Sequence, residues 1–296
     1  MKFEFDTAHS RVGMESAKWD AIGPNPAQGV VPLSVADMEL LSPPEIIEEL
    51  KSTAEFGMWG YTWWGQRYAD AVKHWLSTRH GWDIQKDWII QTNGVVQTLY
   101  ASVRAFTQPG DQVILFPPVY YPFYRVIRNT GRRAVYHPLT ERNGIYTVDL
   151  EQFEQTIVAQ RPKLFLLCSP HNPVGRVWRE EELRGMLACC QRHQVQVVSD
   201  EIHHDILMPG HRHCSATRLW QGEGKPITFF SSSKTFNLAG MKNSILVLPE
   251  EAQREQFDAF QRKLGISEGS TLDYVAVTAA FLGGKEWLWN SPASQQ

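Results

Sequence analysis

The sequence has few cysteines and no long apolar run, and each absence removes a class of protein. The four cysteines, Cys168, Cys189, Cys190 and Cys214, form no C-x-x-C pair, so they predict small core residues rather than a disulfide framework. No apolar run approaches the length needed to span a bilayer, and the start, MKFEFDTAHSRV, lacks a basic segment followed by an apolar one. We therefore expect a cytoplasmic protein.

Charge of one sign is not concentrated anywhere in the chain either. The formal net charge is -3 at pH 7, and no run of lysines or arginines interrupts the mixture of acidic and basic residues. Electrostatic capture of nucleic acid or of an anionic membrane therefore has no basis in the sequence. With 296 residues, 43% of them hydrophobic, the chain can bury a large core, and we expect a globular protein whose partner is a small molecule.

Short apolar runs that end in Pro, Ser or Asn recur along the middle of the chain and predict the buried strands of a mainly parallel sheet. They lie at residues 87–93, 112–118, 163–170, 195–201, 227–233 and 244–249. Segments with apolar residues at helical spacing, such as 95–106 and 183–190, separate several of these runs. Strand and helix alternate, so the predicted class is α/β.

A helix near the start of the chain has clear boundary signals. Ser42 is expected to cap its N-terminus, with Pro43 in the first turn and Glu45 closing a capping box, and Gly57 is expected to follow its last turn. This helix would connect an N-terminal segment to the main body of the protein. The sequence thus predicts three parts: an N-terminal arm at 1–45, a large α/β domain at 46–280 and a short tail at 281–296.

Polar residues that follow the predicted strands are candidates for ligand binding, because open α/β sheets bind ligands beyond the carboxyl ends of their strands. Gly94 precedes a helix whose free N–H groups favour a phosphate, although a glycine there is more often only a turn residue. Tyr120 and Tyr121 could stack on a planar ligand or pack as ordinary aromatics. Asn172, in a turn rich in proline, could donate to a phenolate-like oxygen or serve the turn itself.

Two charged residues are harder to explain as structural. Asp200 follows an apolar run, where a carboxylate needs a buried cation such as a protonated pyridine nitrogen. Lys234 also follows an apolar run, and a partly desolvated lysine beside a cationic ring has a lowered pKa and can form a Schiff base. Ser231, Ser232 and Ser233 precede it and offer donors to a phosphate. Together these residues predict a pyridoxal 5′-phosphate site.

The histidine-rich stretch SDEIHHDILMPGHRHC, residues 199–214, raises the alternative of a metal-dependent hydrolase. A metal site there would explain neither Lys234 nor Asn172, so no metal is predicted and residues 211–214 are expected to form an ordinary loop. A nucleotide site at GEGKP is also disfavoured, because the first glycine of a phosphate loop is missing and Pro226 stands where Ser or Thr is required.

These motifs resemble those of class I/II, fold-type I aminotransferase-like enzymes. SSSKTFNLAG resembles their lysine motif, and SPHNPVGRVW and SDEIHHDI resemble their Asn and Asp blocks in the same order. With LSVADMEL, GYTWWG and PPVYYPFY, the set resembles more narrowly the bacterial C–S lyases of the MalY/PatB cystathionine β-lyase group, over roughly residues 18–285. The resemblance implies a three-layer αβα sandwich and pyridoxal 5′-phosphate as cofactor.

The resemblance also implies a role for each matching residue. Lys234 would be the Schiff-base lysine and proton shuttle, Asp200 the partner of the pyridine nitrogen, and Asn172 the donor to the ring oxygen and a substrate contact. His203 would lie near the ring and Asp200. The remaining assignments are Tyr120 for ring stacking and, with Tyr121, for catalysis; Gly94, Val95, Val96, Ser231, Ser233 and Lys242 for the phosphate; Ala36, Asp37 and Tyr121 for the substrate; and Tyr61 for the phosphate of the neighbouring subunit in a homodimer with shared active sites.

The chain departs from the family pattern in two places. The family has an arginine that clamps the phosphate where this chain has Lys242, so a point charge replaces a fork of donors. The family also continues into a C-terminal small domain whose arginine binds the substrate α-carboxylate, whereas this chain ends at LWNSPASQQ. The resemblance therefore implies a C-terminally truncated member, for which an inactive remnant is one alternative.

The implied reaction is α,β-elimination from cystathionine or a cysteine S-conjugate, which gives a thiol, pyruvate and ammonia. Lys234 would remove the α-proton, and the ring held protonated by Asp200 would stabilise the carbanion until a thiol leaves the β-carbon. Transamination shares the early steps, so a pyridoxal-phosphate-dependent aminotransferase of the same fold is the other alternative. The choice of the lyase rests on the resemblance.

Overall fold

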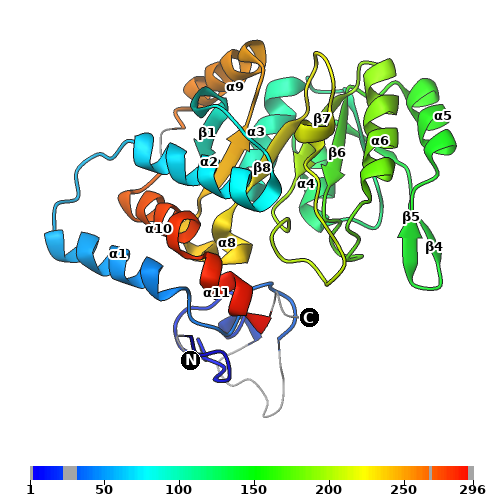
Figure 1. Ribbon diagram of the computed structural model, residues 1–296. Helices are drawn as coiled ribbons and strands as arrows, with labels where there is room; N and C mark the ends of the chain where they lie inside the picture. The colour runs from blue at the N-terminus through cyan, green and yellow to red at the C-terminus, as the bar shows by residue number, and fades with distance from the viewer. Residues whose placement is uncertain (1–2, 23–31, 267–268, 293–296) are drawn as a thin grey trace.

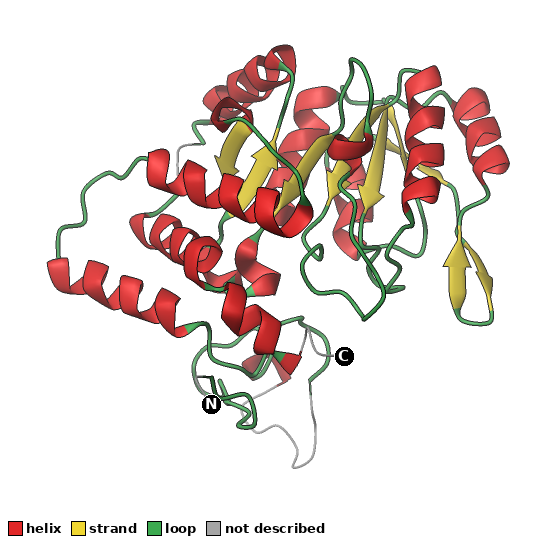
Figure 2. Ribbon diagram, viewed as in Figure 1, coloured by secondary structure: helices red, strands yellow, loops and turns green. Residues whose placement is uncertain are grey.

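A seven-stranded sheet forms the centre of the computed structural model, which describes residues 3–22, 32–266 and 269–292 (Figure 1). Its strands lie in the order β1-β9-β8-β7-β6-β2-β3, and a separate hairpin, β4–β5, projects from the body of the protein (Figure 2). The strand bounds are β1 (Ile89–Thr92), β2 (Gln112–Leu115), β3 (Arg133–Tyr136), β4 (Thr140–Arg142), β5 (Ile145–Thr147), β6 (Leu164–Cys168), β7 (Gln196–Asp200), β8 (Ile227–Phe230) and β9 (Ser244–Val247).

Most neighbouring strands are parallel, which confirms the mainly parallel sheet predicted from the sequence. The pairs β7–β8, β6–β7, β2–β6 and β2–β3 are parallel, whereas β9 runs antiparallel to both of its neighbours, β1 and β8. The chain therefore returns from β8 to β9 at one end of the sheet, through α8 (Ser232–Thr235) and η3 (Ala239–Met241). The ends of β1, β2, β6, β7 and β8 and the start of β9 all lie at this end.

Helices cover both faces of the sheet and produce the expected three layers (Figure 2). Successive strand side chains point to opposite faces, so Val113 and Val198 pack with α3, α4 and α9, whereas Ile114 and Val197 pack with α5 and α6. Phe230 belongs to a third apolar cluster with α1, α2 and α10. The remaining helix bounds are η1 (Asp20–Ile22), α1 (Pro44–Phe56), α2 (Gln66–His80), η2 (Lys86–Trp88), α3 (Val95–Phe106), α4 (Tyr121–Asn129), α5 (Leu150–Gln160), α6 (Glu180–Arg192), α7 (Ala216–Leu219), α9 (Glu251–Leu264), α10 (Thr271–Gly283) and α11 (Lys285–Asn290).

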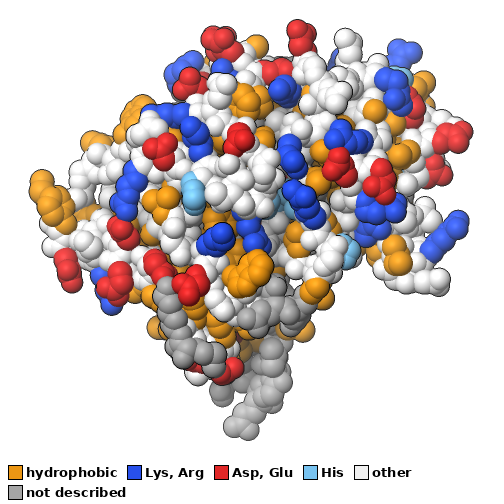
Figure 3. All heavy atoms as spheres, in the orientation of Figure 1, with side chains coloured by type: hydrophobic (Ala, Val, Ile, Leu, Met, Phe, Trp, Pro, Cys, Tyr) orange, Lys and Arg blue, Asp and Glu red, His pale blue; other side chains and the backbone are white. Residues whose placement is uncertain are grey.

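The surface charges and the state of the cysteines agree with what the composition predicts. Acidic and basic side chains are interspersed over the face shown in Figure 3. All four cysteines are free and buried, as predicted for small core residues. Within the described ranges, every helix is too short or too polar to cross a membrane.

The start of α1 differs from the prediction. The helix begins at Pro44 with Pro43 at the N-cap position, and no side chain caps it. Ser42 is instead turned toward the core, where its hydroxyl donates to the Phe236 carbonyl at 3.0 Å, so the predicted N-cap is wrong. The predicted end is confirmed, because Gly57 follows the last turn with φ +70°, a conformation that glycine adopts without strain.

Three strands were not predicted because they lack an apolar run. Strand β3 lies at the edge of the sheet and buries only Val135 fully, and the hairpin strands β4 and β5 are largely exposed. The division of the chain into arm, large domain and tail stays a prediction. Its boundary at residue 280 falls inside α10.

Candidate active site

The polar residues predicted at the strand ends lie at one end of the sheet. Gly94 follows β1, Tyr120 follows β2, Asn172 follows β6, Asp200 ends β7, and Lys234 lies on α8 directly after β8. The antiparallel return into β9 brings Lys242 to the same end, and a Cβ added at Gly94 would lie 3.7 Å from the Lys242 carbonyl oxygen. The connections between strands therefore assemble the site.

Lys234 is half-buried and faces the N-terminal arm. Its Nζ donates to the Ala36 carbonyl at 3.1 Å and lies 3.9 Å from the Asp37 carboxylate. Burial lowers the pKa of Lys234, Asp37 raises it, and Lys242 lowers it again. The net shift is downward, which increases the share of neutral amine at a given pH and suits a nucleophile or a base. Ala36 and Asp37, predicted to line the substrate, are thus brought to the lysine.

Asp200 is buried at the end of the central strand β7, and its side chain accepts one hydrogen bond, from the Ile202 N–H at 3.1 Å. Burial raises the pKa of this carboxyl to about 7, with the Ile202 hydrogen bond lowering it and the adjacent Glu201 raising it. In the described part of the chain, no lysine or arginine forms an ion pair with it. A carboxylate in this setting is stabilised by a ligand that brings a positive charge.

A cavity of about 290 Å³ lies beside the strand ends, and Asn172 and His203 both line it. Burial, the charge of Lys234 and the neighbouring His204 lower the pKa of His203 to about 4, so its imidazole is neutral at pH 7. The chain around Asn172 is shaped by two cis peptide bonds, at Pro170 and Pro173. A larger cavity, of about 650 Å³, lies between β1 and α9 and contains none of the predicted site residues. The smaller cavity is therefore the one that adjoins Asn172 and His203.

Tyr120 and Tyr121 lie at the start of α4 with ring centroids 5.1 Å apart. Tyr120 is half-buried, and burial raises its pKa, with smaller contributions from Tyr121 and from the charge of Asp200. The charge of Asp200 thus reaches Tyr120, whose ring-stacking role stays a prediction. Tyr121 is 56% exposed and lies beneath the Arg125 guanidinium, whose Cζ is 4.4 Å from the ring centroid.

The predicted phosphate residues surround the N-terminus of α3. Gly94 caps this helix with φ +99°, so Val95 and Val96 present backbone N–H groups in its first turn. Lys242 is exposed and close enough to Lys234 to lower its pKa. Ser233 is partly exposed, but Ser231 is buried, accepts from the Ser233 N–H and donates to the Asn243 carbonyl. The Ser231 hydroxyl is thus engaged in capping α8.

Tyr61 is not part of this cluster. It lies in the loop between α1 and α2 and is fully exposed. Within its own chain it contacts none of the strand-end residues described above, which leaves its predicted role across a subunit boundary as a proposal.

Sequence reasoning missed a second group of titratable residues behind the site. Glu201, His204, Asp205 and His213 are all buried, with His80 from the end of α2. His213 lies in a loop, as predicted, but it is buried there and its Nε2 is 3.0 Å from the Glu201 carboxylate. The density of acidic and histidine residues in SDEIHHD was the available signal.

Comparisons with known proteins are consistent with this geometry. The profile of a family described as aminotransferase class I and II matches residues 28–285. Cystathionine β-lyase PatB of Bacillus subtilis strain 168 is 39% identical over 286 residues, which are 96% of this chain and 74% of the relative. Cystalysin from Treponema denticola, whose crystal structure contains pyridoxal 5′-phosphate, superposes with a TM-score of 0.93 at 41% identity, over 97% of this chain and 74% of that one. The pyridoxal-phosphate-bound C–S lyase from Staphylococcus hominis gives 0.89 at 27% identity, over 97% and 72%.

Proposed function

The chain belongs to the aminotransferase class I and II family, and we propose that it is a pyridoxal 5′-phosphate-dependent carbon–sulfur β-lyase that acts on cystathionine or a cysteine S-conjugate. Its relatives include a cystathionine β-lyase and a C–S lyase. One structural observation carries the proposal: a partly desolvated lysine, Lys234, and a buried carboxylate without a cation, Asp200, lie at the same end of the sheet. The products are a thiol, pyruvate and ammonia.

The residues present fit pyridoxal 5′-phosphate. Asp200 needs a positive partner, which a protonated pyridine nitrogen supplies, because burial without one holds its pKa near 7. Lys234 offers a primary amine whose pKa is lowered. The N-terminus of α3 and the charge of Lys242 suit a phosphate dianion. The ring, the aldehyde and the phosphate of the cofactor thus each have a complementary group.

When bound, the cofactor supplies an aldehyde carbon for an amino group and a cationic ring that withdraws electrons from the substrate α-carbon. Asp200 would hold the proton at the ring nitrogen, since a buried carboxylate is stable beside that charge. Lys234 would accept the α-proton of the substrate through its neutral Nζ. The same amine, then protonated, would return a proton to the thiolate that leaves the β-carbon.

The other site residues position and shield these groups. Tyr120 would lie against the ring, and Asn172 would donate to the ring oxygen from the wall of the cavity. His203, neutral at pH 7, would lie beside Asp200 without adding a charge that competes with the ring nitrogen. Ala36, Asp37 and Tyr121 would contact the substrate. The cavity that Asn172 and His203 line has a volume of about 290 Å³, which suits a small molecule rather than a polymer.

Two copies of the chain would complete the site. The last residue of α1 and the loop between α1 and α2 expose a run of large apolar side chains, and the loop extends from the edge of the protein in Figure 1. These residues are Phe56, Met58, Trp59, Tyr61 and Trp63, and each is more than half exposed. Exposed aromatics of this density mark an interface, so a homodimer in which Tyr61 reaches the phosphate of the partner site is proposed.

The four free, buried cysteines suit a reducing compartment, and a cytoplasmic location is proposed on that ground.

Covalent trapping tests the cofactor assignment without relying on turnover. The protein is mixed with pyridoxal 5′-phosphate and reduced with borohydride, and the labelled peptide is identified by mass spectrometry. Lys234 should carry the label, and Lys234→Ala should carry none at the site, while Lys225→Ala, a lysine remote from the strand ends, should label normally. Labelling of other lysines with Lys234 unmodified would contradict the assignment.

A further inference from the structure

A buried network of five titratable side chains lies directly behind the candidate site. Glu201, His204 and Asp205 come from the turn after β7, His213 from the loop that follows, and His80 from the last residue of α2. The His213 imidazole is 3.0 Å from Glu201, and the His80 Nε2 is 2.8 Å from the Asp205 Oδ1. None of these groups has a part in the mechanism above.

The Asp205 carboxylate is the centre of this network. Its Oδ1 is close to the Nε2 of His80, and its Oδ2 accepts from the Thr235 hydroxyl at 2.8 Å and lies 3.2 Å from the Nε2 of His204. The Trp75 indole N–H reaches Oδ2 at 3.1 Å and Oδ1 at 3.3 Å. One carboxylate thereby ties α2, the turn after β7 and α8 together.

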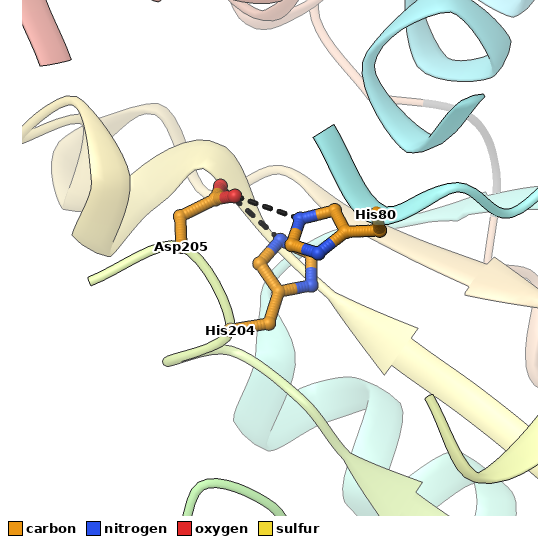
Figure 4. Close-up of side chains that lie close together, drawn as sticks. All are labelled: His80, His204 and Asp205. Carbon is orange, nitrogen blue, oxygen red and sulfur yellow. Dashed lines mark hydrogen bonds and ion pairs between the residues drawn. The ribbon is translucent and has the colours of Figure 1, made fainter. Parts of the chain in front are cut away.

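Hydrogen bonds and ion pairs join these side chains at close range. His80, His204 and Asp205 also have ligand atoms close enough for a metal ion. The two imidazole rings have centroids 4.4 Å apart and planes 36° apart, and both point at the carboxylate (Figure 4). The Asp205 carboxylate is therefore the group that the two imidazoles share.

The charge states agree with a donor network. Burial raises the pKa of Asp205, but the neighbouring His204 and His80 outweigh it and hold the pKa well below the usual range, so the group is an ionised acceptor. Burial lowers the pKa of His80 to about 4, so His80 is neutral at pH 7. A neutral imidazole that faces a carboxylate must carry its proton on the facing nitrogen, and His80 therefore donates through Nε2.

The buried network adjoins the residues that carry the chemistry, on the side away from solvent. In the turn after β7, His203 lines the cavity, whereas Glu201, His204 and Asp205 are buried in the interior. On α8 the same division occurs within two residues: Lys234 is directed to the site, and Thr235 is fully buried against Asp205. Neighbouring residues of a helix are separated by about 100°, so fixing Thr235 fixes the direction of Lys234.

We propose that Asp205 is a positioning residue for Lys234 and acts through the Thr235 hydroxyl, supported by His80 and Trp75. This inference rests on the proposed function, because it concerns the lysine that captures the cofactor. Helix α8 has only four residues, so its internal hydrogen bonds cannot hold it rigidly without an external anchor. The Thr235–Asp205 bond supplies that anchor, from a carboxylate that is itself fixed by α2.

Thr235→Val tests the proposal, since it removes the hydroxyl but keeps the volume and leaves Asp205 its other donors. The measured quantity is the rate at which Lys234 captures pyridoxal 5′-phosphate, followed by borohydride trapping. We expect Thr235→Val to slow capture roughly tenfold, because a small misplacement of a reacting group costs one to two orders of magnitude in rate. Thr235→Ser, which retains the hydroxyl, should restore most of the rate.

Thr217→Val is the matched control, because Thr217 is also buried and donates a hydroxyl bond, to the Pro226 carbonyl at 2.9 Å. Both valine variants should lose comparable thermal stability, but only Thr235→Val should slow capture. The double variant with Asp205→Asn should be no slower than the slower single variant. Capture by Thr235→Val at the wild-type rate, an equal defect in Thr217→Val, or no rescue by serine would overturn the positioning role. Absence of capture by the wild type would instead refute the proposed function.

Discussion

At the scale of single residues, the buried carboxylate of Asp200 serves the proposed function but lowers the stability of the apoprotein. Its carboxylate is buried at the end of β7 with one backbone donor, and burial raises its pKa to about 7. An ordinary aspartate is half ionised at pH 3.8, so above that pH the unfolded chain ionises where the folded apoprotein resists ionisation. The free energy of unfolding of the apoprotein therefore falls as pH rises from about 4 to 7 because of this group.

Asp200→Asn should stabilise the apoprotein and abolish the lyase activity. The pKa difference corresponds to on the order of 4 kcal/mol above pH 7, which the asparagine recovers because it has no charge to bury. Urea unfolding of both apoproteins at pH 8 measures this gain. At pH 4 the two proteins should differ little, and an equal gain at both pH values would show that charge is not the cause.

Asp200 and Lys234 could be singled out from the sequence because charge after an apolar run conflicts with burial unless a ligand resolves it. Thr235 and Asp205 could not, since a threonine beside a lysine and one acid among several carry no such conflict. Their pairing joins positions 30 residues apart, and only the folded chain brings them together. The predicted N-cap of α1 was wrong for a similar reason, because the Ser42 hydroxyl instead donates to the Phe236 carbonyl in a tertiary contact.

At the scale of elements, the loop between α1 and α2 has no apparent function within one chain. Gly57 ends α1 and Gly65 precedes α2, and the residues between them place Trp59 and Trp63 at the surface, 55% and 73% exposed. Side chains of this size are rarely left in water without a partner surface. The sequence predicted a contact to a neighbouring subunit here only through the resemblance of GYTWWG.

Replacing Trp59 and Trp63 with serine should shift the protein from dimer to monomer. Aromatic residues at the centre of an interface each contribute about 2 kcal/mol or more, so the dissociation constant should rise at least about 100-fold. Sedimentation at several protein concentrations measures the change. Ile145→Ser, which alters an exposed apolar residue of the β4–β5 hairpin, should leave the constant unaltered. A wild type that is monomeric at all concentrations would contradict the shared site.

At the scale of the whole molecule, buried histidines make folding sensitive to acid. Burial lowers the pKa of both His80 and His203 to about 4, whereas an unfolded histidine has its ordinary value of 6.5. Between these values the unfolded chain binds protons that the folded chain does not, so the stability that these groups contribute is lost as pH falls from 6.5 toward 4. His80 alone accounts for about 3 kcal/mol at most.

His80→Gln should weaken this dependence. The amide can still donate to Asp205 but has no proton to gain, so the stability of the variant should fall less steeply between pH 6.5 and 4.5. Thermal unfolding across that interval gives the slope for each protein. His74→Gln, a change at an exposed histidine of the same helix, should keep the wild-type slope. Equal slopes for all three proteins would show that His80 is not buried in its neutral form.

Alternation of strand and helix was enough to predict the α/β class, because each of six largely buried strands lies within one of the predicted apolar runs. The three layers were expected only from the family resemblance. The order of the strands and the reversal at β9 were not readable from those runs. Strand order depends on which faces and edges pack together. The apolar sequence of a short buried strand does not indicate whether the strand runs parallel or antiparallel to its neighbours. The structure supplies both, and the reversal brings Lys242 to the site.

Product analysis tests the central claim most directly. The protein, with pyridoxal 5′-phosphate, is mixed with cystathionine in the absence of any keto acid, and thiol, pyruvate and ammonia are quantified together. The proposed β-elimination predicts equal amounts of homocysteine, pyruvate and ammonia from the wild type and none above background from Lys234→Ala. Turnover that requires an added keto acid and releases no thiol, or the same yield from Lys234→Ala, would contradict it.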